Sequence, residues 1–150
     1  MTLRRGRIAV LALLLPSACG GSGTGAPSPA LLQVGGTYDT AVALTEDGCG
    51  GVSVEPRPTV IGHTPGDARF TLAHAAINCA GTVSRDGAFG TEPVSLPDPA
   101  GTATVRIAGR FRITGFDADT TVELARTAGG SCRYVVRWTA TKQGAANVLP

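Results

Sequence analysis

Apolar and polar residues alternate with a period of two through most of the chain from residue 36 onward, a pattern typical of strands with one buried face and one solvated face. The longest run is 104–113, in which the odd positions are apolar or glycine and the even positions are mainly arginine. In the run 133–140 the even positions hold Tyr, Val, Trp and Ala. Asp-Gly at 86–87 and Gly-Gly at 129–130 separate such runs and suit tight hairpins. The pattern predicts an all-β domain of about seven or eight antiparallel strands.

The connections between these runs are mostly short, as a small antiparallel up-and-down barrel requires, although a β-sandwich has a similar number of strands. Three prolines predict a loop over Glu92–Gly101. An immunoglobulin-type sandwich would carry its tryptophan between two cysteines, whereas Trp138 follows the last cysteine of this chain. The sequence therefore favours the barrel and leaves the sandwich as the alternative.

The first strand opens with Gly36-Thr37-Tyr38, which is similar to the Gly-x-Trp at the start of lipocalins with tyrosine in place of tryptophan. The expected number of strands also resembles that of lipocalin-like and avidin-like small barrels. This resemblance implies an architecture and no particular ligand. In such a barrel Tyr38, Phe111 and Trp138 would point into the lumen, where they would either line a site for a small apolar ligand or fill the space themselves.

The arginine-rich run and the strand that follows it also predict a register. Odd-numbered residues of the first and even-numbered residues of the second should face inward, so the numbers of two paired residues must add up to an odd value. A sum of 235 sets Ile113 opposite Val122 and Arg112 opposite Glu123. This register leaves the Asp-Ala pair at 117–118 as the tight turn.

The N-terminal segment has a different composition from the rest of the chain. Arg4, Arg5 and Arg7 precede an apolar run over Ile8–Leu15, and small residues then lead to Cys19. The apolar run is much shorter than the ~20 residues of a membrane-spanning helix. It therefore indicates an export signal and not a permanent anchor.

This leader resembles those of bacterial lipoproteins, in which a lipobox of small residues ends at an invariant cysteine. The resemblance implies a signal peptide over 1–18, cleavage after Ala18 and a diacylglycerol on the sulfur of Cys19. Pro16 departs from the lipobox, since leucine usually occupies this position. The alternative is an ordinary secretory signal that is cut at the same bond and leaves an unmodified cysteine.

The segment 19–35 is rich in glycine, serine and proline, and we expect it to tether a β-domain that spans 36–150. Two or three acyl chains at the start of this tether would hold the protein firmly on a membrane. The expected location is the cell membrane or the outer membrane, on the exported side.

A lipid on Cys19 would leave Cys49, Cys79 and Cys132 in an oxidising compartment, where one disulfide is expected. Cys49 follows the first strand and Cys132 begins the last, and these two strands pair in a closed meander. Cys49–Cys132 is therefore the predicted bridge, and Cys49–Cys79 is its rival. One thiol stays free in either case.

The charged and chemically reactive residues are few. The chain has 13 basic and 11 acidic residues, and removal of the leader leaves ten basic residues against the same 11 acidic ones, which argues against a nucleic-acid partner. The two histidines, His63 in a turn region and His74 on an apolar strand face, match no metal-ligand spacing. Lys142 is the single lysine, and no serine has a nucleophile-elbow context. We therefore expect no enzymatic activity, no metal and no cofactor.

Arginines occupy the polar faces of two predicted strands. They are Arg106, Arg110 and Arg112 on one strand and Arg133 and Arg137 on another. If the strands are close together, the five side chains form a face that can contact phosphate or carboxylate groups bidentately. The alternative is a solvated surface on which the arginines pair with cross-strand acids such as Glu123.

These observations predict a binding or interaction module of the cell envelope. One hypothesis is a barrel that holds a small apolar ligand. The other is a protein-interaction or inhibitor domain, with or without lipid, whose loops Thr45–Gly51 and Glu92–Gly101 contact an envelope protein.

Overall fold

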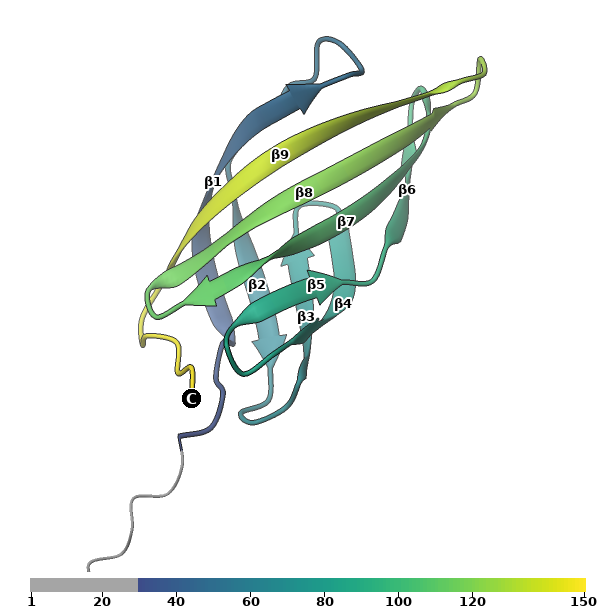
Figure 1. Cartoon of the computed structure of the whole chain (residues 1–150). Coiled ribbons are helices and arrows are strands. Elements are labelled where there is room, and N and C mark those ends of the chain that lie inside the picture. The colour runs from purple at the N-terminus through teal and green to yellow at the C-terminus, as the bar shows by residue number, and fades with distance from the viewer. Residues whose placement is uncertain (1–29) are drawn as a thin grey trace, which may run out of the picture.

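The computed structural model describes residues 30–150, so the predicted signal peptide, Cys19 and most of the tether lie outside the described residues. The nine strands, all antiparallel to their neighbours, are β1 (Gly36–Asp47), β2 (Arg57–His63), β3 (Arg69–His74), β4 (Ile77–Val83), β5 (Ala88–Thr91), β6 (Val94–Asp98), β7 (Gly101–Arg112), β8 (Gly115–Arg126) and β9 (Ser131–Lys142). Eight of these strands close into an antiparallel barrel and β6 is an additional strand at its edge, which confirms the predicted small barrel and excludes the sandwich (Figure 1). Between residues 30 and 150 there is no helix that is long and apolar enough to span a membrane.

Two pairings close the barrel. The first strand pairs with the last, since β1 lies between β2 and β9, as a closed meander requires. The second closure is between β5 and β7, over the three pairs Ala88–Arg110, Phe89–Gly109 and Gly90–Ala108. Beyond these pairs the same edge of β7 is occupied by β6, from Val94 opposite Val105 to Asp98 opposite Gly101.

The barrel is complete along only part of its length, because its strands differ in length. β1, β7, β8 and β9 each have 12 residues, whereas β2 to β5 have between four and seven. The pairing of β1 with β2 ends at Thr40, and that of β7 with β5 ends at Ala108. We call the part with all eight strands the basal half, and the part in which the long strands continue with β6 the distal half (Figure 1).

Aromatic side chains fill the basal half. Tyr38 and all four phenylalanines are buried here and contact one another, with ring centroids 4.6–6.2 Å apart. The inward positions at this level alternate along the strands as the period-two pattern predicts. The lumen of a barrel of eight strands is about wide enough for such side chains to fill it.

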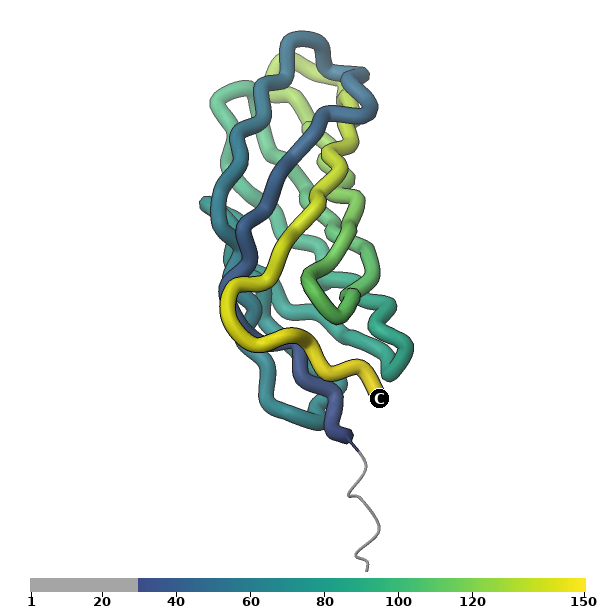
Figure 2. Tube along the Cα trace, turned by 90° about the vertical axis from the view of Figure 1, so that its left-hand side faces the viewer, coloured from purple at the N-terminus to yellow at the C-terminus, as the bar shows by residue number. Residues whose placement is uncertain are grey.

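The two ends of the described chain close the basal end of the barrel (Figure 2). Leu32 and Val34 are buried, and Gln33 pairs with Val148 as an isolated bridge. The side-chain amide of Asn147 donates to the carbonyl oxygens of Arg112 (2.6 Å) and Gly115 (3.1 Å). Residues 32–35, predicted as the end of the tether, therefore belong to the folded domain, because their apolar side chains cap the core.

The distal half is a curved sheet that is open on one side. Its inner face carries Leu44, Val94, Leu96 and Tyr134, all of which are only partly buried. In the described chain β6 pairs with β7 alone, so no strand closes the gap between β6 and β1 at this level. The distal half thus presents an apolar face that the fold itself does not cover completely.

The disulfide lies at the distal end and is the predicted Cys49–Cys132 bridge, with an S–S distance of 2.10 Å. It joins the loop after β1 to the start of β9, and Cys79 is the free, buried thiol. A disulfide is compatible with an exported protein. The rival pairing Cys49–Cys79 is wrong, because Cys79 faces the interior from β4 in the ring of short strands.

The register predicted for β7 and β8 is wrong by eight residues, because Phe111 was expected opposite Leu124, although its parity is correct. Phe111 lies opposite Phe116 and Arg112 opposite Gly115, so paired numbers add up to 227 and the turn is at Ile113-Thr114. The odd sum keeps apolar residues on the inner face, as burial demands. Ile113, which was expected to face inward, is 64% exposed at the tip of the hairpin.

The segment predicted as the loop 92–101 contains strand β6. Pro97 lies opposite Thr102 in this strand, at an edge where a missing N–H is tolerated because β6 has a partner on one side only. This additional strand brings the total to nine in the described chain, compared with the predicted seven or eight.

Candidate functional site

A pocket of about 500 Å³ lies at the distal end of the barrel, beside the disulfide. We call it the distal pocket, and its lining residues are Cys49, Gly50, Gly51, Val52, Ser53, Asp98, Ala100, Leu124, Arg126 and Tyr134. They come from three places in the sequence, namely the loop after β1, the turn between β6 and β7, and the ends of β8 and β9. The volume is in the range of sites that hold small molecules.

The inner face of the sheet provides the apolar part of this pocket. Leu124 is opposite Cys132 on β9 and Ala103 on β7, and Tyr134 is opposite Val122. Tyr134 is half-buried, and burial together with the nearby carboxylate of Asp98 raises the pKa of its hydroxyl. The phenol is therefore neutral at physiological pH and is able to donate a hydrogen bond.

Two charged groups mark the outer edge of the same inner face. Gly101 on β7 lies opposite Asp98 on β6 and opposite Arg126 on β8. Asp98 comes two residues after Leu96, and Arg126 two residues after Leu124, so both lie on the inner face of the sheet. The guanidinium of Arg126 donates to the carbonyl oxygen of Cys49 (3.1 Å). In the described chain no carboxylate forms an ion pair with Arg126.

The loop wall of the pocket is held by the carboxylate of Asp47. Its Oδ1 accepts hydrogen bonds from the backbone N–H groups of Cys49 (3.2 Å) and Gly50 (2.7 Å), and its Oδ2 accepts one from Val52 (3.2 Å). Desolvation works against the ionised form of Asp47, but these N–H groups outweigh it and lower the pKa of the carboxyl. With the disulfide, they fix a loop whose glycines at 50 and 51 have positive φ angles of 78° and 74°.

The distal pocket therefore combines an aromatic and aliphatic surface with one anionic, one cationic and one phenolic group at its edge. This combination can bind a molecule that has an apolar part and a polar or zwitterionic part. Neither histidine lines the distal pocket.

The three residues expected to point into the lumen are all buried, and of the two alternatives they fill the lumen and do not line a ligand site. Tyr38 packs against Phe111 and Phe116, and its hydroxyl lies 2.5 Å from the carbonyl oxygen of Val34 and 2.7 Å from Oδ1 of Asn147. Burial raises the pKa of Tyr38, and the hydrogen bond to Asn147 acts in the opposite direction. An apolar ligand at this level would have to displace core side chains.

Trp138 lies at the boundary between the two halves, where it stacks on His74 with ring centroids 4.1 Å apart. Nδ1 of His74 is 2.9 Å from the hydroxyl of Thr59, which in turn is 2.7 Å from the hydroxyl of Thr40. Burial, and to a lesser extent the charge of Arg57, lowers the pKa of His74. His74 is thus a neutral, hydrogen-bonded core residue, as expected from its strand face.

The structure places the five predicted arginines on the outer surface, each with a carboxylate partner. The ion pairs are Arg106–Glu123, Arg110–Asp86, Arg112–Asp117, Arg133–Glu46 and Arg137–Asp119. β8 lies between the two arginine strands and supplies three of the acids. The arrangement favours pairing of the arginines with carboxylates over a free anion-binding face, and exposed ion pairs of this kind contribute little to stability.

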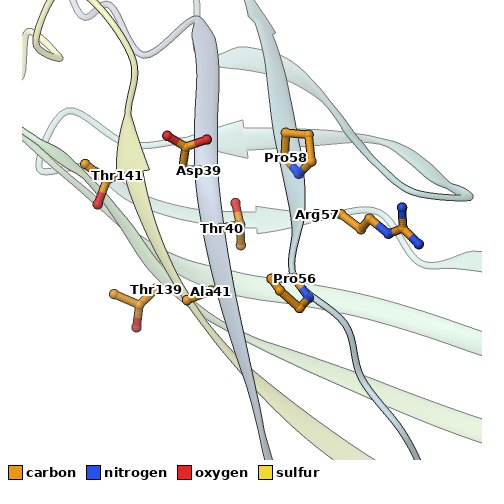
Figure 3. Close-up of a pocket in the computed structure, with 8 residues that line it drawn as sticks. All are labelled: Asp39, Thr40, Ala41, Pro56, Arg57, Pro58, Thr139 and Thr141. Atoms are coloured by element: carbon orange, nitrogen blue, oxygen red, sulfur yellow. The ribbon is translucent and has the colours of Figure 1, made fainter.

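A second hollow, of about 460 Å³, lies on the outer surface of β1, β2 and β9 (Figure 3). It is lined by Asp39, Thr40, Ala41, Pro56, Arg57, Pro58, Thr139 and Thr141. Figure 3 shows the guanidinium of Arg57 directed away from the other labelled side chains, and it pairs with Glu55 at 2.9 Å. Asp39 accepts a hydrogen bond from Gln143 (2.8 Å). The polar groups of this hollow do not converge, so it is a weaker candidate than the distal pocket.

The remaining reactive side chains have structural partners. His63 lies beside the N-terminal segment, with Nδ1 accepting from the N–H of Val34 (3.4 Å) and Nε2 2.9 Å from the carbonyl oxygen of Asp67. Burial raises the pKa of the Cys79 thiol, which makes it a poor nucleophile. Within residues 30–150 no three His, Cys, Asp or Glu side chains gather where they could hold a metal ion.

Comparison with known protein families, with curated proteins and with solved structures finds no match for this chain. The candidate site therefore stands on geometry alone. Sequence reasoning identified Cys49, Cys132 and the two loops at the distal end, but not Asp98, Arg126 or Tyr134. The sequence feature that points to this end of the barrel is the glycine-rich turn at 48–51, which contains a cysteine of the predicted disulfide.

Proposed function

We propose that this protein is an exported bacterial lipoprotein whose β-domain binds a small amphipathic molecule in the distal pocket and has no enzymatic activity. The apolar part of the ligand lies on Leu124 and Tyr134, and its polar part faces Asp98 and Arg126. The observation that carries the proposal is the arrangement of these four side chains on the uncovered inner face of the distal half.

Two features support export and anchoring. The leader ends at Cys19 with the anatomy of a lipoprotein signal, and the domain holds a disulfide between two residues 83 positions apart in the sequence. The folded domain begins close after the predicted tether, at the basal end, so the distal pocket lies at the opposite end of the barrel from the proposed anchor (Figure 2).

Native mass spectrometry of protein isolated from its own cell envelope tests the binding site. We expect a co-purifying small molecule on the wild type and its loss from Asp98→Asn. The asparagine keeps the side-chain acceptor for the N–H of Ala100 (2.8 Å) but removes the charge. The matched control is Asp39→Asn in the outer hollow, which likewise keeps its acceptor for Gln143. A ligand lost equally from both variants, or absent from all three proteins, contradicts the pocket.

Fractionation of the cell tests the anchor separately. Cys19→Ser should move the protein from the membrane fraction to the soluble fraction, and the wild type alone should carry the mass of acyl chains. A serine variant that stays membrane-bound, beside a wild type without acyl mass, would rule out the lipoprotein.

A second candidate function is the binding of an envelope protein through the loops at the distal end. The structure brings the loop after β1 and the turn after β6 together at the distal pocket, although they are about fifty residues apart in the sequence. Cross-linking from the loop, with a reagent attached at Ser53→Cys, should capture a protein partner under this hypothesis and none under the first.

A further inference from the structure

The basal end of the barrel exposes two large apolar side chains. Leu31 is 59% exposed and Ile113 is 64% exposed. The third large apolar side chain that is exposed in the described chain, Val60 (49%), lies on the outer wall, in the middle of β2. Removal of apolar side chains from water is favourable, so two of them exposed at one end of the barrel form a surface that can pack against an apolar environment.

Both side chains are carried by backbone that is fixed to the barrel. Ile113 occupies the two-residue turn between β7 and β8, and its carbonyl oxygen accepts from the N–H of Asn147 (2.8 Å). Leu31 precedes the buried Leu32, whose carbonyl oxygen accepts from the N–H of Gly66 (2.7 Å). The two residues therefore cannot fold back into the core, and they stay directed away from it.

A hollow of about 470 Å³ lies beside Leu31 at the same end. Its lining residues are Ala30, Leu31, Leu32, Gly66, Asp67, Ala68, Val83, Arg85 and Pro150. Arg85 is exposed, and in the described chain no carboxylate forms an ion pair with it. A guanidinium above an apolar hollow suits the phosphate of a lipid headgroup, with Asp67 at the edge as the opposing charge.

The proposed anchor brings this end to a membrane. Only 11 residues separate Cys19 from Leu31. Even a fully extended chain of that length spans no more than about 40 Å. The described chain begins at the basal end, so this end and not the distal end is the one that the proposed anchor holds nearest the lipid (Figure 1).

We propose that the basal end docks on the surface of a phospholipid bilayer, with Leu31 and Ile113 inserted among the lipid headgroups and Arg85 at a phosphate. This inference rests on the lipid anchor proposed above and adds a fixed orientation to it. The barrel then stands on the membrane with the distal pocket facing away from it. Two apolar side chains and one guanidinium bind a bilayer only weakly. The covalent lipid keeps the domain at the membrane surface, so that this weak contact is formed most of the time.

Site-directed fluorescence on the full, acylated chain in phosphatidylcholine vesicles tests the docking. An environment-sensitive dye is attached at Ile113→Cys, with the same dye at Ala128→Cys in the distal turn between β8 and β9 as the reference. Cys79 is buried and the other two cysteines of the domain are bonded, so the dye is directed to the new thiol. Quenching by a lipid-borne nitroxide should be severalfold stronger at 113 than at 128.

A matched pair of substitutions shows whether the contact is specific. In the protein labelled at 113, Leu31→Ser should reduce the quenching severalfold, whereas Val60→Ser on the outer wall should leave it unchanged. Mass spectrometry of the same samples reports the acyl chains. Equal quenching at 113 and 128 on acylated protein overturns the docking and leaves the anchor intact, while a chain without acyl mass overturns both.

Discussion

The basal and distal halves of this barrel share four long strands but differ in what lies between them. In the basal half, Tyr38 and four phenylalanines fill the lumen, and the ends of the described chain cover it. In the distal half the same strands enclose no such cluster. The inner face ends there in two residues of opposite charge, Asp98 and Arg126. The difference in strand length separates the two halves, because β2 to β5 do not extend into the distal half. A barrel can thus keep its stability in one half and leave the other half open for binding.

The largest effect should come from the basal core. Phe111→Ala removes a ring that touches four other aromatic rings, and we expect a loss of about 3–5 kcal/mol in the free energy of unfolding. Leu96→Ala on the partly exposed distal face should cost about 1 kcal/mol, because part of this side chain already contacts water. Urea unfolding monitored by circular dichroism measures both.

Equal losses for these two variants would contradict the division into halves. If Phe111→Ala does not fold, Phe111→Leu serves as the milder truncation at the same position. It should still be more destabilising than Leu96→Ala.

The next largest effect should come from the disulfide, which is the main link across the distal end. Replacing both Cys49 and Cys132 with serine should lower the free energy of unfolding by about 2–4 kcal/mol, since the bridge closes a long loop. Limited proteolysis should then cut the chain first at 48–56, while fragments from the basal half remain folded. An unchanged urea midpoint, or first cleavage in the basal half, would show that the distal loop is held by something other than the bridge.

The smallest effect concerns pH and the boundary between the halves. The folded-state pKa of His74 is lowered by burial and by Arg57, so protonation favours the unfolded chain. Its contribution is complete above the unfolded pKa of about 6.5 and is lost as the pH falls below that value toward the folded pKa. Urea midpoints at pH 7.5 and pH 5 should therefore differ less in His74→Gln than in the wild type. Val60→Ser on the outer wall of β2, which changes no titratable group, is the control and should keep the wild-type dependence.

The parity of the strands could be predicted from the sequence, whereas the register of one hairpin could not. Alternation identifies the inward face of β7 and β8 because burial acts on every second residue. The turn was assigned to Asp117-Ala118 because aspartate favours turns. In the structure Asp117 stays in the strand, where Arg112 on β7 pairs with it across the outer face.

Packing against a third strand decides the register. Gly109 lies opposite Ala118, and a Cβ at Gly109 would come 2.1 Å from the carbonyl oxygen of Asp117. Ala118 in turn lies opposite Trp138, so two small residues occupy the row that contains the large indole. The fit of these small residues to the indole depends on β7, β8 and β9 together. The alternation pattern of any two of these strands is therefore not enough to predict the register.

The distal pocket was out of reach for the same reason. Arg126 and Tyr134 lie on one predicted hairpin, but only the pairing order of β6, β7 and β8 brings Asp98 to the same end. The disulfide could be predicted because it depends on a single pairing, that of the first strand with the last. The loop expected around Pro97 concealed β6, since an edge strand accepts the proline that a central strand would reject.

The pairing of β1 with β9 also sets the order in which the molecule can form. Contacts between the first and last strands separate residues by about a hundred positions, and barrels dominated by such non-local contacts fold slowly. One edge of β1 has no partner until β9 is available, and Cys49 cannot form its native bridge until Cys132 is available. During that interval the unpaired edge of β1 is open to pairing with another chain. Closure of the ring therefore waits for the last strand, and the native bridge beside it forms only on a chain that is present through Cys132.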